Sequence, residues 1–205
     1  ILIVGGGAAG IATAASLHKR DASLDIAIIE PSATHYYQPG WTMVGAGIFK
    51  KEETARSTAS VMPSYVTQIR GTVASFQPDE NSVRLEDGKA LTYGSLVVAA
   101  GLKLDWAAIE GLEEALGRNG VTSNYRYDLA PYTWELVQKM RGEKAIFTQP
   151  PMPIKCAGAP QKAMYLSCST WMQVGKIKDI DVSFCNAGPV LFGCADYVPP
   201  LMEYV

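Results

Sequence analysis

The strongest constraint on this chain is the order of its first thirty residues. An apolar run of strand length leads into a glycine-rich turn, an Ala-rich segment with a basic end, a second apolar run and an acid: residues 1–4, 5–10, 11–20, 25–29 and Glu30. Ala-rich composition favours a helix, and basic residues suit its last turn because that end carries a partial negative charge. The order therefore predicts a strand, a tight turn, a helix and a second parallel strand.

Each special position in this unit has a physical role in holding a dinucleotide. Gly5 allows the tight turn, Gly7 lets a pyrophosphate approach the backbone, and Gly10 lets the helix pack closely on the strand. The unpaired N–H groups of the first helical turn attract phosphate. Glu30 can accept hydrogen bonds from ribose hydroxyls, and its charge disfavours the 2′-phosphate of NADP. We therefore predict cofactor contacts from Gly5, Gly7, Ala8, Ala9, Gly10 and Glu30; the motif alone does not distinguish FAD from NAD.

A later apolar run favours one of these two dinucleotides. Residues 91–101 are predicted to form one strand that ends in the small residues Ala99, Ala100 and Gly101. This ending resembles the second signature of the flavoproteins with two dinucleotide-binding domains, in which the first glycine motif holds FAD. The resemblance implies that these three residues pass close to FAD. Ala100 departs from the usual Thr, which removes a hydroxyl and keeps a small side chain.

The second half of the chain repeats the order strand, helix, strand. Apolar periodicity predicts a strand at residues 144–148, a helix at 159–174 and a strand at 181–185. We therefore predict an α/β protein with two Rossmann-like domains, each built on a doubly wound parallel sheet. Residues 1–103 would bind FAD, and residues 104–205 would form an incomplete domain of the NAD type.

The loop between the strand and the helix of the second half, residues 149–160, lacks the nucleotide signature. It carries one glycine and four prolines, which fix φ and stiffen the backbone. The next strand ends in Cys185 and Asn186 rather than in an acid that could bind a ribose. Both contacts to a nicotinamide nucleotide are thus absent, and we expect electrons to come from a donor other than NADH.

In place of the glycines this loop carries Cys156, just before a helix whose first turn contains Pro160. The positive end of that helix and the adjacent Lys155 favour a thiolate. The loop also lies at the carboxyl end of its strand, where doubly wound sheets bind ligands. A buried structural thiol is the alternative. The stiff loop and its location favour a reactive cysteine, and we predict Cys156 as the catalytic residue.

These residues resemble the sulfide:quinone oxidoreductases of the type that includes the mitochondrial enzyme. The resemblance runs along nearly the whole chain, and it is most specific around Cys156 and in the aromatic stretch that follows Glu30. The matching segments are 154–162, 164–167, 35–39, 41–42, 44–47, 123–125 and 145–148.

The resemblance implies FAD-dependent oxidation of sulfide to sulfane sulfur. Cys156 would be bridged through sulfur to a second cysteine, sulfide would open that bridge, and electrons would pass through the flavin to a membrane quinone. The sulfane sulfur would leave to a small thiol or another nucleophilic acceptor. In the family the partner cysteine, the second FAD loop and the membrane-docking helices lie in a later segment, beyond Val205. This implies a peripheral protein of a bacterial or mitochondrial inner membrane, and self-association into a homo-oligomer is left open.

The other cysteines are expected to have lesser roles. Cys185 ends the strand next to the one that feeds Cys156, so it is an alternative partner, although neighbours at a sheet edge are often too far apart for a disulfide. Cys168 and Cys194 are expected to be structural. No cysteine precedes Cys156, so FAD is predicted to be bound non-covalently, and the Cys-x₄-Cys pair of dithiol reductases is missing after Glu30.

The aromatic segment 35–41 has two interpretations. Either it lines the flavin, with Gln38 and Pro39 approaching the ring, or it packs on the core, which is the better expectation for Trp41. Gln38 is accordingly included among the predicted cofactor contacts.

Composition and residue spacing argue against several other classes of protein. A net charge of −2 gives no electrostatic reason for a nucleic-acid partner, and the cysteine spacing matches no zinc pattern. No apolar run reaches the ~18 residues of a membrane span. The chain starts without Met and stops in an apolar stretch, so we expect it to be part of a longer protein.

Three rival functions remain open from the sequence. A type II NADH:quinone oxidoreductase would share fold, FAD and quinone, although the proline-rich loop argues against it. The subunit of a periplasmic flavocytochrome sulfide dehydrogenase is a second rival. The third is an FAD-binding scaffold without turnover, which would act through protein contacts.

Overall fold

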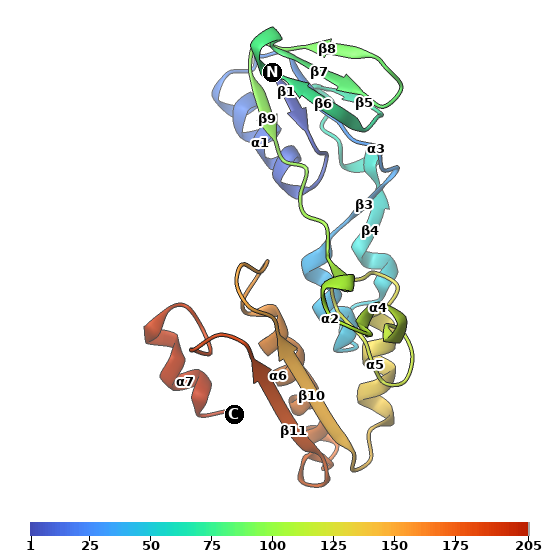
Figure 1. Ribbon diagram of the computed structural model, residues 1–205, viewed down its shortest axis with the longest axis vertical. Helices are drawn as coiled ribbons and strands as arrows, with labels where there is room; N and C mark the ends of the chain where they lie inside the picture. Colours follow the sequence, from blue (N-terminus) through green and yellow to red (C-terminus); the bar gives the residue numbers. More distant parts are fainter. Residues whose placement is uncertain (205) are drawn as a thin grey trace. The chain divides into compact units, whose positions relative to one another are not determined.

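The computed structural model describes residues 1–204 (Figure 1). The chain forms two compact units: the first comprises Ile1–Tyr37 and Glu52–Ala108, and the second comprises Gln38–Lys51 and Ile109–Val205. Residues 38–51 thus group with the second half of the chain, although they are flanked in sequence by the first unit.

The first unit is built on a four-stranded parallel sheet. Its strands lie in the order β5 (Val66–Ile69), β2 (Ile26–Ile29), β1 (Leu2–Val4) and β9 (Leu96–Val98). Leu2 of β1 pairs with Ala27 on one side and with Leu96 on the other. The chain passes from β1 to β2 through α1 (Ala8–Arg20), the crossover helix that neighbouring parallel strands require. This arrangement confirms the predicted α/β fold with a parallel sheet.

The alternation of side chains along β1 decides which residues face each neighbouring layer. Ile3 is buried in a cluster with Ile28 of β2 and Ala14 of α1. Leu2 and Val4 point to the opposite face of the sheet. An amphipathic helix therefore covers one face, and the other face needs a second apolar layer.

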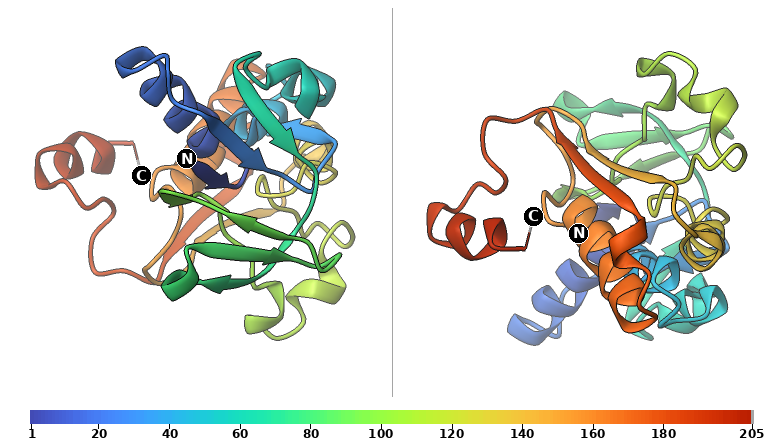
Figure 2. Two further views of the ribbon diagram at one scale, coloured as in Figure 1. Left: turned by 90° about the horizontal axis from the view of Figure 1, so that it is seen from above. Right: turned by 90° about the horizontal axis from the view of Figure 1, so that it is seen from below.

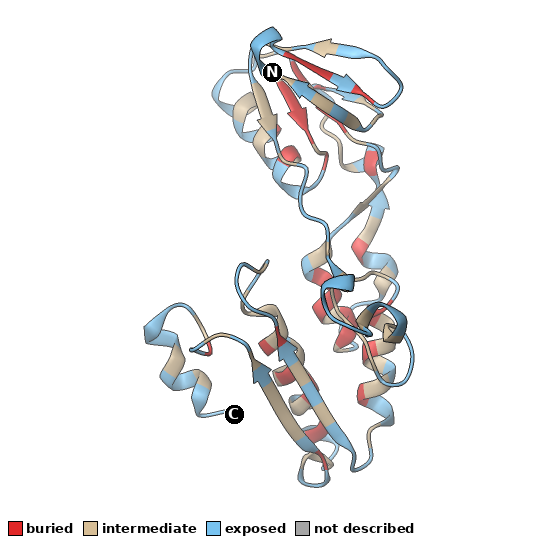
Figure 3. Ribbon diagram, in the orientation of Figure 1, coloured by how far each residue is buried: buried red, intermediate tan, exposed pale blue. Residues whose placement is uncertain are grey.

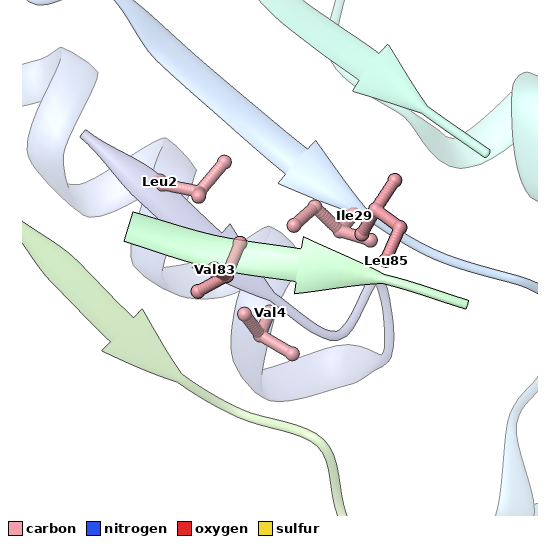
Figure 4. Close-up of a cluster of buried hydrophobic side chains, with 5 residues drawn as sticks. All are labelled: Leu2, Val4, Ile29, Val83 and Leu85. Atoms are coloured by element: carbon pink, nitrogen blue, oxygen red, sulfur yellow. The ribbon is translucent and has the colours of Figure 1, made fainter. Parts of the chain in front are cut away.

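That second layer is an antiparallel sheet of three strands, β6 (Val73–Gln77), β7 (Ser82–Leu85) and β8 (Ala90–Thr92). Val83 and Leu85 of β7 pack on Leu2, Val4 and Ile29 (Figure 4). Burial of each such side chain stabilises the unit by roughly 1.5–3 kcal/mol. Figure 3 shows the buried residues of this unit concentrated in β1 and in the strands that pack around it.

The remaining elements of the first unit lie on either side of residues 38–51 in sequence. β3 (Thr34–Tyr36) and β4 (Ala55–Ser57) form an antiparallel pair, and α3 (Thr58–Val61) follows β4 directly. Short 3₁₀ turns occur in both units. Within residues 1–204 they lie at Gln38–Gly40, Lys51–Thr54, Pro78–Glu80, Trp106–Ala108, Ile177–Asp179 and Ala195–Tyr197.

The second unit is a strand–helix–strand unit with further helices. β10 (Lys144–Gln149) and β11 (Asp181–Asn186) are parallel neighbours, and α6 (Ala159–Gln173) connects them and lies alongside both strands (Figures 1 and 2). The other helices are α2 (Trp41–Gly45), α4 (Leu112–Ala115), α5 (Ala130–Lys139) and α7 (Val198–Met202). Each of the three elements predicted for this half is found within two residues of its expected ends.

Trp171 organises the core of the second unit. Its side chain is 2% exposed and packs with Val137 of α5 and with Ile180. Its indole N–H donates to the Val137 carbonyl at 2.9 Å. Val137 lies in the last turn of α5, where carbonyls have no partner within the helix, so the indole caps α5 from α6. A separate cluster contains Trp41, as expected for a core residue, with Val44 and Ala130.

One predicted element is wrong. Residues 91–101 do not form a single strand: β8 ends at Thr92 and β9 begins at Leu96. β8 pairs with β7 in the antiparallel sheet, whereas β9 pairs with β1 in the parallel sheet. Residues 93–95 carry the chain from one layer to the other, and Gly94 and Ser95 suit such a bend.

Candidate functional site

The glycine loop between β1 and α1 has almost no room for side chains at two of its positions. A Cβ at Gly5, whose φ is +107°, would lie 2.3 Å from the carbonyl oxygen of Ala99. A Cβ at Gly10 would lie 1.9 Å from the carbonyl oxygen of Gly5. Nothing lies within 4 Å of the Cβ position at Gly7. The loop is thus packed on its inner side and open at Gly7, as a backbone that receives a ligand requires.

The start of α1 offers unpaired backbone donors next to Gly7. Gly7 is the N-cap residue and has no side chain with which to cap the helix, and the first turn carries no acidic residue. Ala8 and Ala9 are both exposed, and their methyl groups leave the helix end accessible. N–H groups at a helix start and the partial positive charge there bind phosphate groups.

Glu30 is fixed at the end of β2 by two backbone donors. Its Oε2 accepts the N–H of Gly6 at 2.7 Å, and its Oε1 accepts the N–H of Ser32 at 2.7 Å. Each carboxylate oxygen has a second acceptor position. The carboxylate is therefore oriented by the protein and can still accept hydrogen bonds from a pair of hydroxyl groups.

These groups border one open pocket of about 200 Å³. Within it, His35 Nδ1 lies 3.4 Å from the carbonyl oxygen of Gly6. The pocket is lined by Gly6, Gly7, Glu30, Ser32, Thr34, His35, Tyr36 and Thr58. Its lining offers backbone groups of the glycine loop, the Glu30 carboxylate and the rings of His35 and Tyr36, which are kinds of group that can contact a dinucleotide.

The end of β9 closes the glycine loop from the other side. The N–H of Ala99 donates to the carbonyl of Val4 at 2.7 Å, and the close contact between Ala99 and Gly5 follows from this pairing. Ala100 is exposed, and Gly101 adopts a φ of +76°, where a residue with a Cβ would be strained. The first unit thus brings together all the predicted cofactor contacts except Gln38, and their geometry fits a dinucleotide.

The second unit places Cys156 in the loop between β10 and α6. The side chain is exposed, and the backbone adopts a φ of +65°, which is uncommon for a residue other than glycine. The Cys156 carbonyl accepts the N–H of Ala159, the first residue of α6, at 3.0 Å. Gly158 is the N-cap residue, and Pro160 lies in the first turn of α6 as expected. The thiol is thus presented on a tight turn immediately before a helix.

Two further residues of the second unit contact Lys155, which precedes this cysteine. The Lys155 ammonium group donates to Oε1 of Gln38, and the hydroxyl of Tyr125 donates to the Lys155 carbonyl. Lys155 Nζ also lies 6.0 Å from the centre of the Tyr125 ring. Gln38 therefore lies near the cysteine loop in the second unit. No local sequence pattern identifies Tyr125 as part of the site, because its contact with the Lys155 carbonyl joins residues thirty positions apart.

The other thiols have different surroundings. All four cysteines lie in the described part of the chain, and none is disulfide bonded there. Burial raises the pKa of the Cys168 thiol, so this half-buried group on α6 stays neutral. Cys185 is exposed on β11 and pairs with Thr148 of β10, and Cys194 is also exposed. Within residues 1–204, no group of three or more acidic, His or Cys side chains could hold a metal ion.

Comparison with protein families identifies the family to which this chain belongs. The family model described as pyridine nucleotide-disulphide oxidoreductase matches residues 1–135. The chain belongs to this family. Members of the family typically bind FAD, and the dinucleotide geometry of the first unit agrees with that membership.

Two curated relatives within the family are mitochondrial proteins. The chain is 44% identical over 200 residues to the sulfide:quinone oxidoreductase of Dictyostelium discoideum. This alignment covers 96% of this chain and 44% of that protein. The chain is also 41% identical over 205 residues to the mouse sulfide:quinone oxidoreductase. This second alignment covers all of this chain and 46% of that protein. The chain is therefore a homologue of these flavin oxidoreductases, and it spans about half of their length.

Solved structures agree on the fold. The sulfide:quinone oxidoreductase of Aquifex aeolicus superposes with a TM-score of 0.82 at 24% identity, over 99% of this chain and 48% of that one. NDH2 of Plasmodium falciparum in complex with NADH superposes with a TM-score of 0.61 at 13% identity, over 99% of this chain and 45% of that one. At these identities the likeness concerns the fold alone.

Proposed function

We propose that the protein carrying this chain is an FAD-dependent sulfide:quinone oxidoreductase that oxidises sulfide to sulfane sulfur. The observation that carries the proposal is 41–44% identity to two mitochondrial sulfide:quinone oxidoreductases over nearly the whole chain. The exposed thiol of Cys156, on a tight turn where a second nucleotide-binding loop would otherwise begin, supports it. Neither feature alone would name the substrate.

In this proposal residues 1–103 form the FAD-binding domain, and residues 104–205 form a domain of the NAD type without its nucleotide. Gly7 and the first turn of α1 would receive the pyrophosphate, and Glu30 would accept the ribose hydroxyls. Ala99, Ala100 and Gly101 would lie beside the cofactor, and Gln38 is a further contact by family resemblance. When bound, non-covalently, the flavin would accept two electrons and pass them to a quinone.

Cys156 would supply the sulfur chemistry as one end of a bridge to a second cysteine. Sulfide attacks the bridge, so that one sulfur–sulfur bond forms and another breaks, leaving sulfane sulfur on one cysteine and a thiolate on the other. The sulfane sulfur then passes to a small thiol or another nucleophilic acceptor. Re-formation of the bridge releases two electrons, which reduce the quinone to a quinol with the uptake of two protons.

The location of the protein in the cell follows from the same proposal. Both mitochondrial relatives and the quinone substrate favour a peripheral protein of an inner membrane, mitochondrial or bacterial, with oligomeric state left open. Among residues 1–204, no helix combines the length and the apolar character needed to span a bilayer.

The test is an anaerobic titration of the FAD-loaded full-length protein with sulfide, followed by flavin absorbance. In the wild-type protein, sulfide should produce a long-wavelength absorbance band and then bleach the flavin. Cys156→Ser should show neither the band nor the bleaching, and Cys185→Ser should behave as wild type. Loss of the reaction in Cys185→Ser would make Cys185 the partner cysteine. No bleaching of wild type by sulfide would refute the proposal, and bleaching by NADH instead would favour an NADH:quinone oxidoreductase.

A further inference from the structure

The backbone at Cys156 needs to be held in place. Its φ of +65° lies in the left-handed region, which is strained for a residue with a Cβ. Such a conformation persists only where the surrounding structure fixes it. Lys155 and Cys156 are exposed, and Ile154, Ala157 and Gly158 are only partly buried, so apolar burial supplies little of this constraint.

Hydrogen bonds flank the strained residue on both sides. On the C-terminal side, the Cys156 carbonyl accepts the N–H of Ala159 at 3.0 Å, which ties it to the start of α6. On the N-terminal side, the Lys155 carbonyl, which belongs to the peptide group that joins Lys155 to Cys156, accepts the hydroxyl of Tyr125. Rotation of that peptide group would break the second bond, so the Tyr125 hydroxyl opposes the change in φ that would relieve the strain.

Tyr125 is itself well placed to act as an anchor. Its side chain is only partly exposed, and its backbone N–H donates to the hydroxyl of Ser123 at 3.1 Å. The preceding Thr122 bonds to the hydroxyl of Thr133 on α5 at 2.7 Å. The segment that carries the phenol is thus tied to a helix of the same unit. On the N-terminal side of Cys156, the other contact of Lys155 is made by its long side chain, which donates to Gln38, so the Tyr125 hydroxyl is the contact that acts on the Lys155–Cys156 peptide group itself.

The phenol also keeps its proton while the thiol reacts. Burial raises the pKa of Tyr125, and the negative charge of a Cys156 thiolate raises it further. An acid with a raised pKa stays protonated to higher pH, so the hydroxyl remains a donor to the Lys155 carbonyl when Cys156 becomes anionic.

We propose that Tyr125 is a positioning residue for Cys156: its hydroxyl holds the Lys155–Cys156 peptide in the conformation that presents the reacting sulfur. This proposal rests on the proposed function, because positioning matters only if Cys156 takes part in the reaction. Tyr125 touches the backbone beside Cys156 and takes no proton or electron itself. Its effect should therefore fall on the rate of the reaction and leave sulfide binding little changed.

The test compares Tyr125→Phe with Tyr165→Phe in the FAD-loaded full-length protein. Tyr165 is a matched control, because its hydroxyl also donates to a backbone carbonyl, that of Leu201 at 3.1 Å, within the same unit. The first measurement is hydrogen–deuterium exchange of residues 150–159. The second is stopped-flow reduction of the flavin over a range of sulfide concentrations, with thermal unfolding of each variant recorded alongside.

In Tyr125→Phe the amide of Ala159 and its neighbours should exchange at least tenfold faster. The limiting rate of flavin reduction should fall at least tenfold, the half-saturating sulfide concentration should change less than twofold, and Tyr165→Phe should change neither. Unchanged exchange would overturn the anchoring, and faster exchange with a normal limiting rate would make Tyr125 merely structural. If sulfide fails to reduce the wild-type flavin, the proposed function falls and this proposal with it, whereas failure of Tyr125→Phe to show an effect leaves the wild-type reaction intact.

Discussion

Replacing Glu30 by Gln tests whether its carboxylate orients the cofactor. The carboxylate accepts two backbone N–H groups, from Gly6 and Ser32, each at 2.7 Å. A Gln amide has one acceptor oxygen, so it can satisfy only one of them. Gly6 is buried and Ser32 is exposed, so we expect the oxygen to turn to Gly6 and leave the Ser32 N–H to water. That loss costs about 1 kcal/mol, or about 2–4 °C in melting temperature for a chain of this size.

The effect on FAD should be larger than the effect on stability. Hydrogen bonds to a charged acceptor contribute about 1.5–3 kcal/mol, and the neutral amide keeps only part of that contribution to the ribose hydroxyls. We expect FAD to bind about 10–100-fold more weakly, which is roughly 1.4–2.8 kcal/mol.

Fluorescence titration of the apoprotein with FAD measures the affinity, and thermal unfolding of the apoprotein measures the stability. Asp21→Asn is a matched control, because Asp21 also accepts a backbone N–H, from Ser23 at 2.9 Å, but on the exposed surface of the same unit. Its FAD affinity should equal that of wild type. A Glu30→Gln protein that binds FAD within twofold of wild type would refute the assignment of Glu30.

Three other predictions concern packing and thiol chemistry. Gly7→Ala should weaken FAD binding at least tenfold with an unchanged apoprotein melting temperature, whereas Gly10→Ala should lower that temperature, because its Cβ would lie 1.9 Å from a carbonyl oxygen. Trp171→Phe leaves the buried Val137 carbonyl without its donor and should lower the free energy of unfolding in urea by about 2–4 kcal/mol. Burial raises the pKa of Cys168, so iodoacetamide should label it more slowly than the exposed thiols at mildly alkaline pH. The stability contributed by its neutral form is lost as the pH rises through that raised pKa, and peptide mass analysis and urea unfolding over a pH series test both statements.

The parts of the fold that depend on local pattern were predictable. In residues 1–30 the apolar runs, the glycines and the acid all act within a few positions, and β1, α1 and β2 lie close to where they were expected. The segment 91–101 was not predicted correctly, because β8 pairs with β7, the strand just before it in sequence, whereas β9 pairs with β1 at the start of the chain. Pairing is a tertiary property, which strand propensity does not report.

The same limit applies to the candidate site. Cys156 and the turn before α6 could be located from Pro160 and the flanking periodicity. The contact between Tyr125 and the Lys155 carbonyl could not, because it joins two loops thirty residues apart. The grouping of residues 38–51 with the second unit was missed for a similar reason, since Trp41 packs against Ala130.

The discontinuity of the second unit has a consequence for the order in which the chain can fold during synthesis. Residues 38–51 leave the ribosome long before α5, which supplies Ala130 to cover Trp41 and Val44. At roughly 5–20 residues per second, this interval lasts several seconds. Throughout it, an indole and a valine that end up buried stay exposed to water and to other nascent chains, while β1, α1 and β2 can already pair. We therefore expect α2 to remain accessible to chaperones until α5 has been synthesised.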